Sequence, residues 1–461
     1  MGQMNLTVIG GGSVNWMKDL MRDVYLLDEI EGGRICLVDP NLEYASAVKG
    51  MLETFNRLRG KNFAVYVTDE RRQALPGSDF VMTTFSPGTM DGFENDLEIP
   101  IKYGIRLPVS MTVGIPGISA ALRTVPVAYE IVRDMEELCP QAWLLNVTNP
   151  MSCVIGAMHR ASEKVRIIGM CHEFHGFDQY IGPALGLYRP RGMDILTYLY
   201  RWLGEQGFRY TVAGINHFIW LIQAEKDGED ALEKIREYAR THTAFDPLED
   251  APASGPFHNS GEAKLALCRQ FGYLPLAGDR HLIEFYPSLC NPLTGYGMKW
   301  NVRKTTVDLR RANIGKNLAY IQSIARGETE VDWSRSGEEM TEIIRSILTG
   351  RATTAIVNAP NQGQIENMPR GAVVETLASV DGEGVHPRRS GKLPGAVGAL
   401  CRLHAEVQQM TVEAALSGDR RLLIEAMSLD PSSGTADFSR IPELAEELIQ
   451  ANRAWLPRFF D

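Results

Sequence analysis

The stretch NLTVIGGGSVNWMKDLMRDVYLL, residues 5–27, decides the fold that the sequence predicts. It begins with an apolar run typical of a buried strand and passes through three consecutive glycines. It ends in a segment with the apolar spacing of an amphipathic helix. The order of strand, glycine-rich turn and helix predicts the first unit of a doubly wound parallel sheet.

Further apolar runs of strand length follow this unit, with the helical pattern of residues 42–60 among them. The runs are RICLVDP (34–40), NFAVYVTD (62–69), SDFVMTTF (78–85), AWLLNVTN (142–149) and VRIIGMC (165–171). Strands that alternate with helices favour a parallel sheet, and unbroken apolar runs suit strands covered on both faces. We therefore expect an α/β fold with a Rossmann-type, doubly wound domain over residues 1–185.

Residues 186–461 show a different pattern and predict a mixed α+β, helix-rich second domain. Segments 195–207 and 230–244 have helical periodicity, whereas 209–225 and 353–381 are rich in strand formers. The stretch near 252–262 has loop composition. We expect this second domain to close over the first and to contribute to substrate and metal binding.

The composition narrows the classes of function. The chain has 461 residues and a net charge of -10, which argues against nucleic-acid binding. No run approaches the roughly 20 apolar residues of a membrane helix. The 7 cysteines are scattered without a CxxC pair, and the first residues lack the pattern of a signal peptide. These features together predict a cytoplasmic protein with no membrane or nucleic-acid partner.

The glycine-rich turn is the candidate cofactor site. Gly10, Gly11, Gly12 and Ser13 lie between the first strand and its helix, where backbone N–H groups can approach a pyrophosphate. The third glycine of the usual dinucleotide fingerprint is replaced, but Asp39 ends the second strand, where an acidic residue binds the adenosine ribose. This favours NAD over NADP. The alternative is a plain turn with a helix-capping aspartate.

The stretch GMCHEFHG, residues 169–176, is the candidate metal site. Cys171 and His172 follow a predicted strand, and His217 follows another in the segment GINH. A thiolate and an imidazole from two elements can hold one divalent transition metal with open positions for substrate. The alternative is a buried cysteine that packs as a small apolar residue and a histidine with ordinary hydrogen bonds.

A series of short motifs carries a family resemblance over nearly the whole chain. The motifs, in chain order, are IGGGS (9–13), PIKYG (100–104), ALRTVPV (121–127), NVTNP (146–150), GMCHE (169–173), GINH (214–217), HLIEFYP (281–287) and VNAPNQGQIENMPRGAVVE (357–375). Together they resemble glycoside hydrolase family 4, whose members are NAD- and metal-dependent glycosidases. In that family a Cys-His-Glu-Val stretch is associated with α-galacturonidases. Phe174 replaces the valine here, so α-galacturonides are expected first, and an α-glucuronide or another α-glycoside stays open.

The resemblance implies a reaction that is not a direct displacement at the anomeric carbon. NAD oxidises C3 of the sugar, a base removes the C2 proton, the aglycone is eliminated, and water adds before the hydride returns. The resemblance also implies a divalent metal, with manganese favoured, and a homo-oligomer.

The same resemblance assigns roles to individual residues. Cys171 and His217 match the metal ligands, and Asn149 matches a substrate-binding asparagine. His172 stands where some members have an aspartate proposed as general acid. Glu173 would lie beside the sugar and select among substrates.

Arg123 could pair with a carboxylate of the substrate, or it could hold a local backbone carbonyl. The segment SPGTMDGFEND, residues 86–96, lacks the arginine that many members have after the fourth strand. Since phospho-sugar substrates need extra cationic groups, we expect a sugar without a phosphate.

The residue that removes the C2 proton is uncertain from the sequence. Phe285 occupies the place of the tyrosine base of several members, and Tyr286 follows it. An offset of one residue turns a side chain to another direction. Tyr286 is the first candidate, with His281, Glu284 or a hydroxide held by the metal as alternatives.

Two other classes of function compete with a glycosidase. A plain NAD-dependent hydroxy-acid dehydrogenase would share the fold but would need no thiolate. A non-catalytic NAD-binding protein would have little use for the cysteine and histidine motifs together.

Overall fold

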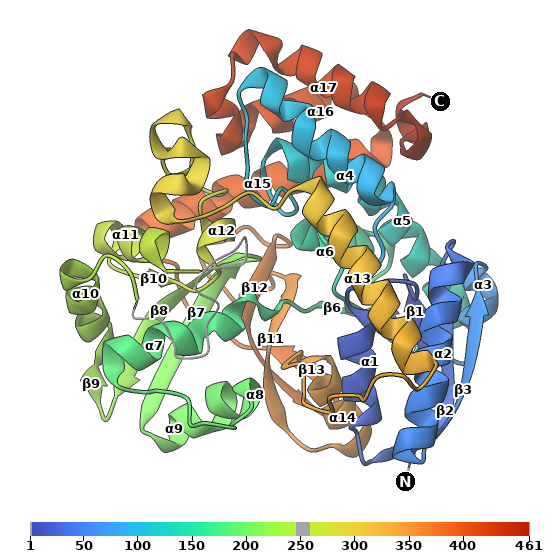
Figure 1. The fold of residues 1–461 in the computed structure, drawn as a ribbon. Coiled ribbons are helices and arrows are strands. Elements are labelled where there is room, and N and C mark those ends of the chain that lie inside the picture. Colours follow the sequence, from blue (N-terminus) through green and yellow to red (C-terminus); the bar gives the residue numbers. More distant parts are fainter. Residues whose placement is uncertain (1, 246–258, 461) are drawn as a thin grey trace.

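The computed structural model describes residues 2–245 and 259–460, and its strands form one mixed sheet of 13 strands (Figure 1). The strands are β1 (Gly2–Ile9), β2 (Ile30–Val38), β3 (Asn62–Thr68), β4 (Phe80–Thr83), β5 (Trp143–Asn146), β6 (Arg166–Gly169), β7 (Phe208–Ile215), β8 (Phe218–Lys226), β9 (Glu229–Asp230), β10 (Leu274–Pro275), β11 (Thr353–Pro360), β12 (Val373–Asp381) and β13 (Gly384–Pro387).

The first six strands confirm the predicted Rossmann-type fold. Their order is β3-β2-β1-β4-β5-β6, and every neighbouring pair is parallel. This is the strand order of dinucleotide-binding folds. Parallel strands end at the same edge of a sheet, so the turns after β1, β2, β5 and β6 gather at one edge.

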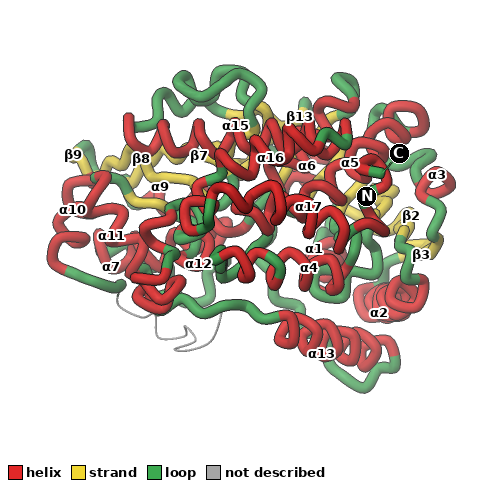
Figure 2. The backbone as a smooth tube through the Cα atoms, turned by 90° about the horizontal axis from the view of Figure 1, so that it is seen from above, coloured by secondary structure: helices red, strands yellow, loops and turns green. Residues whose placement is uncertain are grey.

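The α-helices cover both faces of the sheet. They are α1 (Met17–Tyr25), α2 (Leu42–Arg59), α3 (Arg71–Ala74), α4 (Thr89–Glu98), α5 (Gly114–Leu138), α6 (Met151–Ala161), α7 (Asp178–Leu185), α8 (Ile195–Thr197), α9 (Leu203–Glu205), α10 (Ala231–Thr241), α11 (Glu262–Phe271), α12 (Asp279–Leu282), α13 (Val307–Ala325), α14 (Met340–Thr349), α15 (Gly395–Ser417), α16 (Arg420–Leu429) and α17 (Ile441–Ala451). Figure 2 shows α13 and α15 on opposite sides of the sheet. No helix in the described ranges is long and apolar enough to cross a membrane.

Alternating side chains in β1 explain the two layers. Leu6 and Val8 pack into a core with α1, α2, α13 and α14. Ile9 points to the other face, into a core built with α3, α5 and α6. Because successive residues of a strand face opposite sides, one apolar strand supplies both cores.

The second part of the chain continues the same sheet. β11 is antiparallel to β6, and β12, β7, β8 and β10 follow across the sheet in antiparallel pairs. The mixed α+β character predicted after residue 185 is therefore present, and the strands of both parts share one sheet. The division into two domains at residue 185 stays a prediction. Most of the loop predicted near 252–262 lies outside the described residues.

Candidate active site

The carboxyl edge of the parallel strands carries the residues that the sequence singled out. The glycine turn follows β1, Asp39 follows β2, Asn149 lies shortly after β5, and Cys171 lies shortly after β6. Ligands bind at this edge in open α/β sheets. The topology therefore brings the candidate cofactor residues and the candidate metal residues to the same side of the molecule.

The glycine turn is too tight for side chains. Gly10 has a φ of 93°, and a Cβ there would lie 2.2 Å from the carbonyl oxygen of Thr84. A Cβ on Gly11 would lie 2.7 Å from Cβ of Leu37. The turn thus presents bare backbone where the sequence predicted a pyrophosphate, with the beginning of α1 directly behind it.

The Asp39 carboxylate is fixed beside this turn. Its Oδ2 accepts a hydrogen bond from the Gly12 N–H at 2.9 Å, and its Oδ1 accepts one from the Asn41 N–H at 2.8 Å. Ser13 lies in the same turn, where its Oγ accepts a hydrogen bond from the Thr84 hydroxyl at 3.3 Å. Asp39 stays partly exposed at the strand end. This is the placement expected of a ribose-binding carboxylate.

The register of the sheet places Cys171 next to the turn between β7 and β8. Gly169, Asn358, Glu375 and Gly214 lie opposite one another on β6, β11, β12 and β7. Cys171 lies two residues after Gly169, directly before a short 3₁₀ helix, His172–Phe177. The end of β6 and the end of β7 therefore lie in one row of the sheet, with β11 and β12 between them.

Cys171 is half-buried, and its thiol lies among polar side chains. Burial raises its pKa well above the usual range, and the charges of Glu375 and Glu173 act in the same direction. A hydrogen bond with the side chain of Asn216 opposes this shift. A nearby cation would favour the thiolate form, which is the form that binds metals.

His217 lies in the two-residue turn between β7 and β8. It has a φ of 60°, in the left-handed region that residues other than glycine rarely adopt. Its Nδ1 is 2.7 Å from the hydroxyl of Thr112, and the residue is buried. This hydrogen bond orients the ring and leaves Nε2 for another partner, which is the usual arrangement of a metal-binding histidine.

A second histidine joins this group from α12. The ring of His281 lies 4.0 Å from the ring of His217, centroid to centroid. Its Nε2 is 3.2 Å from Oε1 of Glu173, and Oε2 of Glu173 accepts the Gly278 N–H at 2.9 Å. Burial tends to raise the pKa of Glu173, but His281, Arg280 and His217 outweigh it and hold this pKa well below the usual range.

His172 links the metal candidates to the glycine turn. Its ring lies 5.6 Å from the ring of Trp16, the residue just before α1. Its Nδ1 is 3.0 Å from Oε1 of Glu338. Burial lowers the pKa of His172, but the hydrogen bond and charge of Glu338 outweigh it and raise the pKa to about 9. The imidazole is therefore prepared to hold a proton at neutral pH.

The donor set fits an open metal site with two protein ligands. Within residues 2–245 and 259–460, no group of three or more His, Cys, Asp or Glu side chains is arranged to hold a metal. A closed structural site would need four such ligands, whereas a catalytic site keeps positions for substrate. Cys171 and His217 would leave such positions open, and the hydrogen bond between Thr112 and the imidazole would orient the ring.

Asn149 also lies at this edge. It is half-buried, and its Oδ1 accepts a hydrogen bond from the Met151 N–H at 3.2 Å. His175, in contrast, contacts Oε1 of Glu339 at 3.4 Å in a buried network, which agrees with a structural role.

Arg123 holds a local backbone carbonyl, which is one of the two roles that the sequence left open. Its Nη1 donates to Oδ1 of Asp96 at 2.9 Å, its Nη2 donates to Oδ2 of the same carboxylate, and its Nε donates to the carbonyl of Pro87 at 2.7 Å. The residue is 3% exposed. The expected pairing of Arg123 with a substrate carboxylate is therefore wrong, because the guanidinium is already paired with Asp96.

Tyr286 and Phe285 point in different directions, as the one-residue offset implied. Phe285 is fully buried and stacks on Phe218 at 4.6 Å between ring centroids. Tyr286 packs edge-on against Phe271 of α11 at 6.1 Å. The contacts of Tyr286 therefore lie with α11, whereas those of His281 lie with His217 and Glu173.

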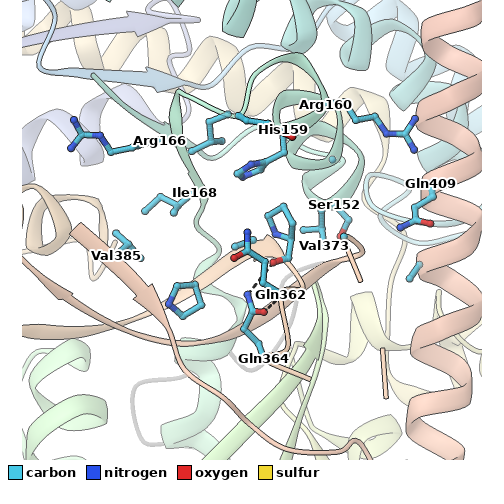
Figure 3. A pocket seen from close by; sticks show the side chains of 18 of the residues that line it. Ser152, His159, Arg160, Arg166, Ile168, Gln362, Gln364, Val373, Val385 and Gln409 are labelled. Atoms are coloured by element: carbon cyan, nitrogen blue, oxygen red, sulfur yellow. Dashed lines mark hydrogen bonds between the residues drawn. The ribbon is translucent and has the colours of Figure 1, made fainter. Parts of the chain in front are cut away.

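One cavity lies away from these residues. It has a volume of about 970 Å³ and is lined from α6, β6, β11 and α15. Figure 3 shows Ser152, His159, Gln364 and Val373 around it. None of the candidate site residues lines this cavity. The candidate chemistry is thus at the open carboxyl edge of the sheet.

The fold and this edge define a Rossmann-type enzyme with a cysteine–histidine site beside its glycine turn. Comparison with known families assigns the chain more closely. Residues 5–187 match the family model described as Family 4 glycosyl hydrolase, and residues 212–433 match its C-terminal domain. The chain belongs to glycoside hydrolase family 4 and is a glycosidase, which confirms the resemblance seen in the sequence.

Two relatives agree with this membership. An α-galacturonidase of Thermoanaerobacterium saccharolyticum is 31% identical over 98% of this chain and 96% of its own. An α-galactosidase of Bacillus subtilis is 30% identical over 98% of this chain and 99% of its own.

A crystal structure of a glucosidase candidate from Bacillus subtilis has a TM-score of 0.86 and 29% identity, covering 97% of this chain and 100% of the other. A 6-phospho-α-glucosidase from gut microorganisms, in complex with NAD and Mn²⁺, has a TM-score of 0.76 and 20% identity, covering 98% and 99%. The second likeness concerns the fold alone.

Glu338, Thr112 and Asn216 are the residues of this site that the sequence did not indicate. Glu338 is far from His172 in the chain and lies in no recognised motif. Asn216 lies inside the motif GINH, so its place next to His217 was the one available signal.

The first prediction concerns the buried pair of Arg123 and Asp96. Arg123→Ala should lower the free energy of unfolding by about 3–5 kcal/mol, since it leaves a buried carboxylate without its partner. Denaturant unfolding measures this change. Arg133→Ala is the control, because Arg133 lies on the same helix and forms an exposed pair with Glu136; it should cost well under about 1 kcal/mol. Equal costs for both variants would contradict the assignment of Arg123.

Proposed function

We propose that the protein hydrolyses α-galacturonides with NAD and a divalent metal, Mn²⁺ being the first choice. The 31% identity to an α-galacturonidase over nearly the full length of both chains supports the substrate. The complex of a 6-phospho-α-glucosidase of the same fold with NAD and Mn²⁺ supports the cofactors. An α-galactoside is the second candidate, because an α-galactosidase is almost equally similar.

The contact between Trp16 and His172 is the observation that carries this proposal. It brings the beginning of α1, where the nicotinamide nucleotide would bind, to the residue next to Cys171. A cofactor held by the glycine turn and a metal held by Cys171 and His217 would then act on the same sugar. A plain hydroxy-acid dehydrogenase would not need this thiol.

The departure of Phe174 from the galacturonidase pattern does not weaken the substrate assignment. Phe174 is 1% exposed and stacks on Phe177 at 5.5 Å between ring centroids. It belongs to the core under the 3₁₀ helix. The change from valine to phenylalanine therefore alters packing, and Glu173 keeps its place among His217, His281 and Arg280.

When bound, NAD would accept and return a hydride at C3 of the sugar, and the metal would polarise the sugar oxygens as a Lewis acid. The side chains supply the proton transfers. His172, kept protonated by Glu338, would act as the general acid for the leaving oxygen. Asn149 would orient the sugar by a hydrogen bond.

Two residues are candidates for the C2 base. Tyr286 is the first candidate from the sequence, but its ring contact is with Phe271. His281 faces Glu173 through Nε2, and its Nδ1 has no hydrogen-bond partner in the part of the chain that the structure describes. A carboxylate that orients an imidazole in this way supports His281 as the proton acceptor. The cytoplasmic location and the homo-oligomer stay predictions from the sequence.

The metal ligand Cys171 gives the second prediction. Cys171→Ser should bind less than about a tenth of the wild-type Mn²⁺ and lose hydrolysis, since a neutral hydroxyl replaces a thiolate. Elemental analysis and a calorimetric NAD titration measure metal and cofactor separately, and NAD affinity should be retained. Cys139→Ser, at the end of α5, is the control that should keep both. Full metal content in Cys171→Ser would exclude Cys171 as a ligand.

The third prediction concerns Asp39. Asp39→Ala should weaken NAD binding by about 10-fold and raise the affinity for NADP relative to NAD, because the carboxylate that excludes a 2′-phosphate is gone. Fluorescence of Trp16 and the other tryptophans, followed during cofactor titration, gives both dissociation constants. An unchanged preference for NAD would place the adenosine ribose away from Asp39.

The fourth prediction separates the two base candidates. His281→Gln should abolish the release of sugar, whereas Tyr286→Phe should retain activity within about threefold and release sugar that carries solvent deuterium at C2. Mass spectrometry of sugar released in D₂O measures the incorporation. The opposite outcome, with Tyr286→Phe inactive and His281→Gln active, would restore Tyr286 as the base.

A further inference from the structure

A uronide differs from the corresponding neutral glycoside by a carboxylate, which needs a cationic partner in the site. Arg123 cannot be that partner, since Asp96 occupies its guanidinium. We propose that Arg310, in the first turns of α13, binds the substrate carboxylate with Arg280 of α12 beside it. This inference rests on the proposed function and adds the residue that selects an acidic sugar.

The guanidinium of Arg310 has no protein anion as a partner. The structure gives it no hydrogen bond or ion pair with any residue among 2–245 and 259–460, and its Nε is buried without a hydrogen-bond partner. The guanidinium carbon lies 4.3 Å from the centre of the Phe93 ring. The aromatic face of Phe93 supports the plane of the cation and leaves its N–H edge unused.

The neighbouring cations of the same segment behave differently. Arg311 contacts Glu94 at 2.7 Å and Asp91 at 3.3 Å, and Lys304 contacts Glu98 at 2.8 Å. These carboxylates all belong to α4. The acids of α4 are therefore paired with other residues, while Arg310 lies over Phe93 of the same helix.

Arg280 interacts both with Arg310 and with residues of the cysteine–histidine site. Its Nη2 lies 3.7 Å from Oε1 of Glu173, and its side chain is 20% exposed. Its charge also acts on His172, His217, His281 and Glu284, as well as on Arg310. Arg280 thus contacts the carboxylate of the cysteine–histidine site, and its charge also acts on Arg310.

The balance of charge around Arg310 favours an anionic ligand. Burial and the charge of Arg280 lower the pKa of Arg310 to about 10 against the opposing charge of Glu284, so the side chain stays charged at neutral pH. Burial raises the pKa of Glu284 to about 7, and its Oε1 accepts the N–H groups of Val109 and Ser110 at 2.8 Å each. A half-neutral Glu284 does not compensate Arg310, and Glu173 is shared between Arg280 and His281.

A substrate carboxylate would give Arg310 the anionic partner that the described residues do not supply. Arg310 can offer two parallel N–H donors to one carboxylate, which a lysine cannot. A neutral galactoside has no anionic group that could pair with the guanidinium of Arg310. The structure therefore assigns the choice between acidic and neutral sugars to Arg310.

The experiment compares Arg310→Gln with Arg311→Gln, its exposed neighbour. Each variant is loaded with NAD and Mn²⁺ and assayed on 4-nitrophenyl α-D-galacturonide and 4-nitrophenyl α-D-galactoside. Arg310→Gln should lose roughly 10- to 100-fold of kcat/KM on the galacturonide and less than about threefold on the galactoside. Arg311→Gln should change neither. Arg310→Lys should recover only part of the loss, because a lysine restores the positive charge without the two parallel N–H donors of the guanidinium.

A binding measurement separates this inference from the proposed function. Calorimetric titration with D-galacturonate needs no turnover, and Arg310→Gln should bind it roughly 10- to 100-fold more weakly than the wild type. Thermal unfolding checks that the variant is folded. Equal losses on both substrates, or D-galacturonate bound equally by wild type and Arg310→Gln, would overturn the role of Arg310. A wild type that binds D-galacturonate through Arg310 but cleaves no galacturonide would overturn the proposed function alone.

Discussion

The site depends on one constraint, which is that β6 and the β7–β8 turn are held in register by the continuous sheet between them. Gly169, Asn358, Glu375 and Gly214 form one row through four strands. This row fixes the distance between Cys171, which follows β6, and His217, which follows β7. A shift of one residue in any of the pairings would turn alternate side chains to the other face and separate the two candidate ligands.

Buried polar groups maintain this register. Asn358 donates to Oε1 of Glu375 at 2.8 Å, and Asn216 approaches the same oxygen at 3.4 Å. Burial raises the pKa of Glu375 to about 8, with the two asparagines opposing the shift. A buried polar group without partners costs roughly 1–3 kcal/mol, so alternative pairings that separate these three side chains are unfavourable. The network beneath Cys171 thus specifies the arrangement on which metal binding depends.

The sequence was sufficient for the elements with strong local signals. The glycine turn, Asp39 and the six parallel strands follow from periodicity and turn chemistry, and the motif GINH marked His217. It was insufficient where a role depends on contacts between distant segments. Arg123 has the composition of a ligand-binding residue, yet Asp96 of α4 neutralises it. Glu338 and Arg310 have no local signature, because only the packing of α13 and the segment before α14 brings them to this edge.

The central claim is that one sugar lies between a nicotinamide and a metal held by Cys171 and His217. A crystal structure of the protein with NAD, Mn²⁺ and D-galacturonate tests it most directly. The account predicts manganese bonded to both the Cys171 sulfur and the His217 imidazole, with the nicotinamide ring against the same sugar. Manganese at other side chains, or a nicotinamide that does not contact the sugar, would contradict it.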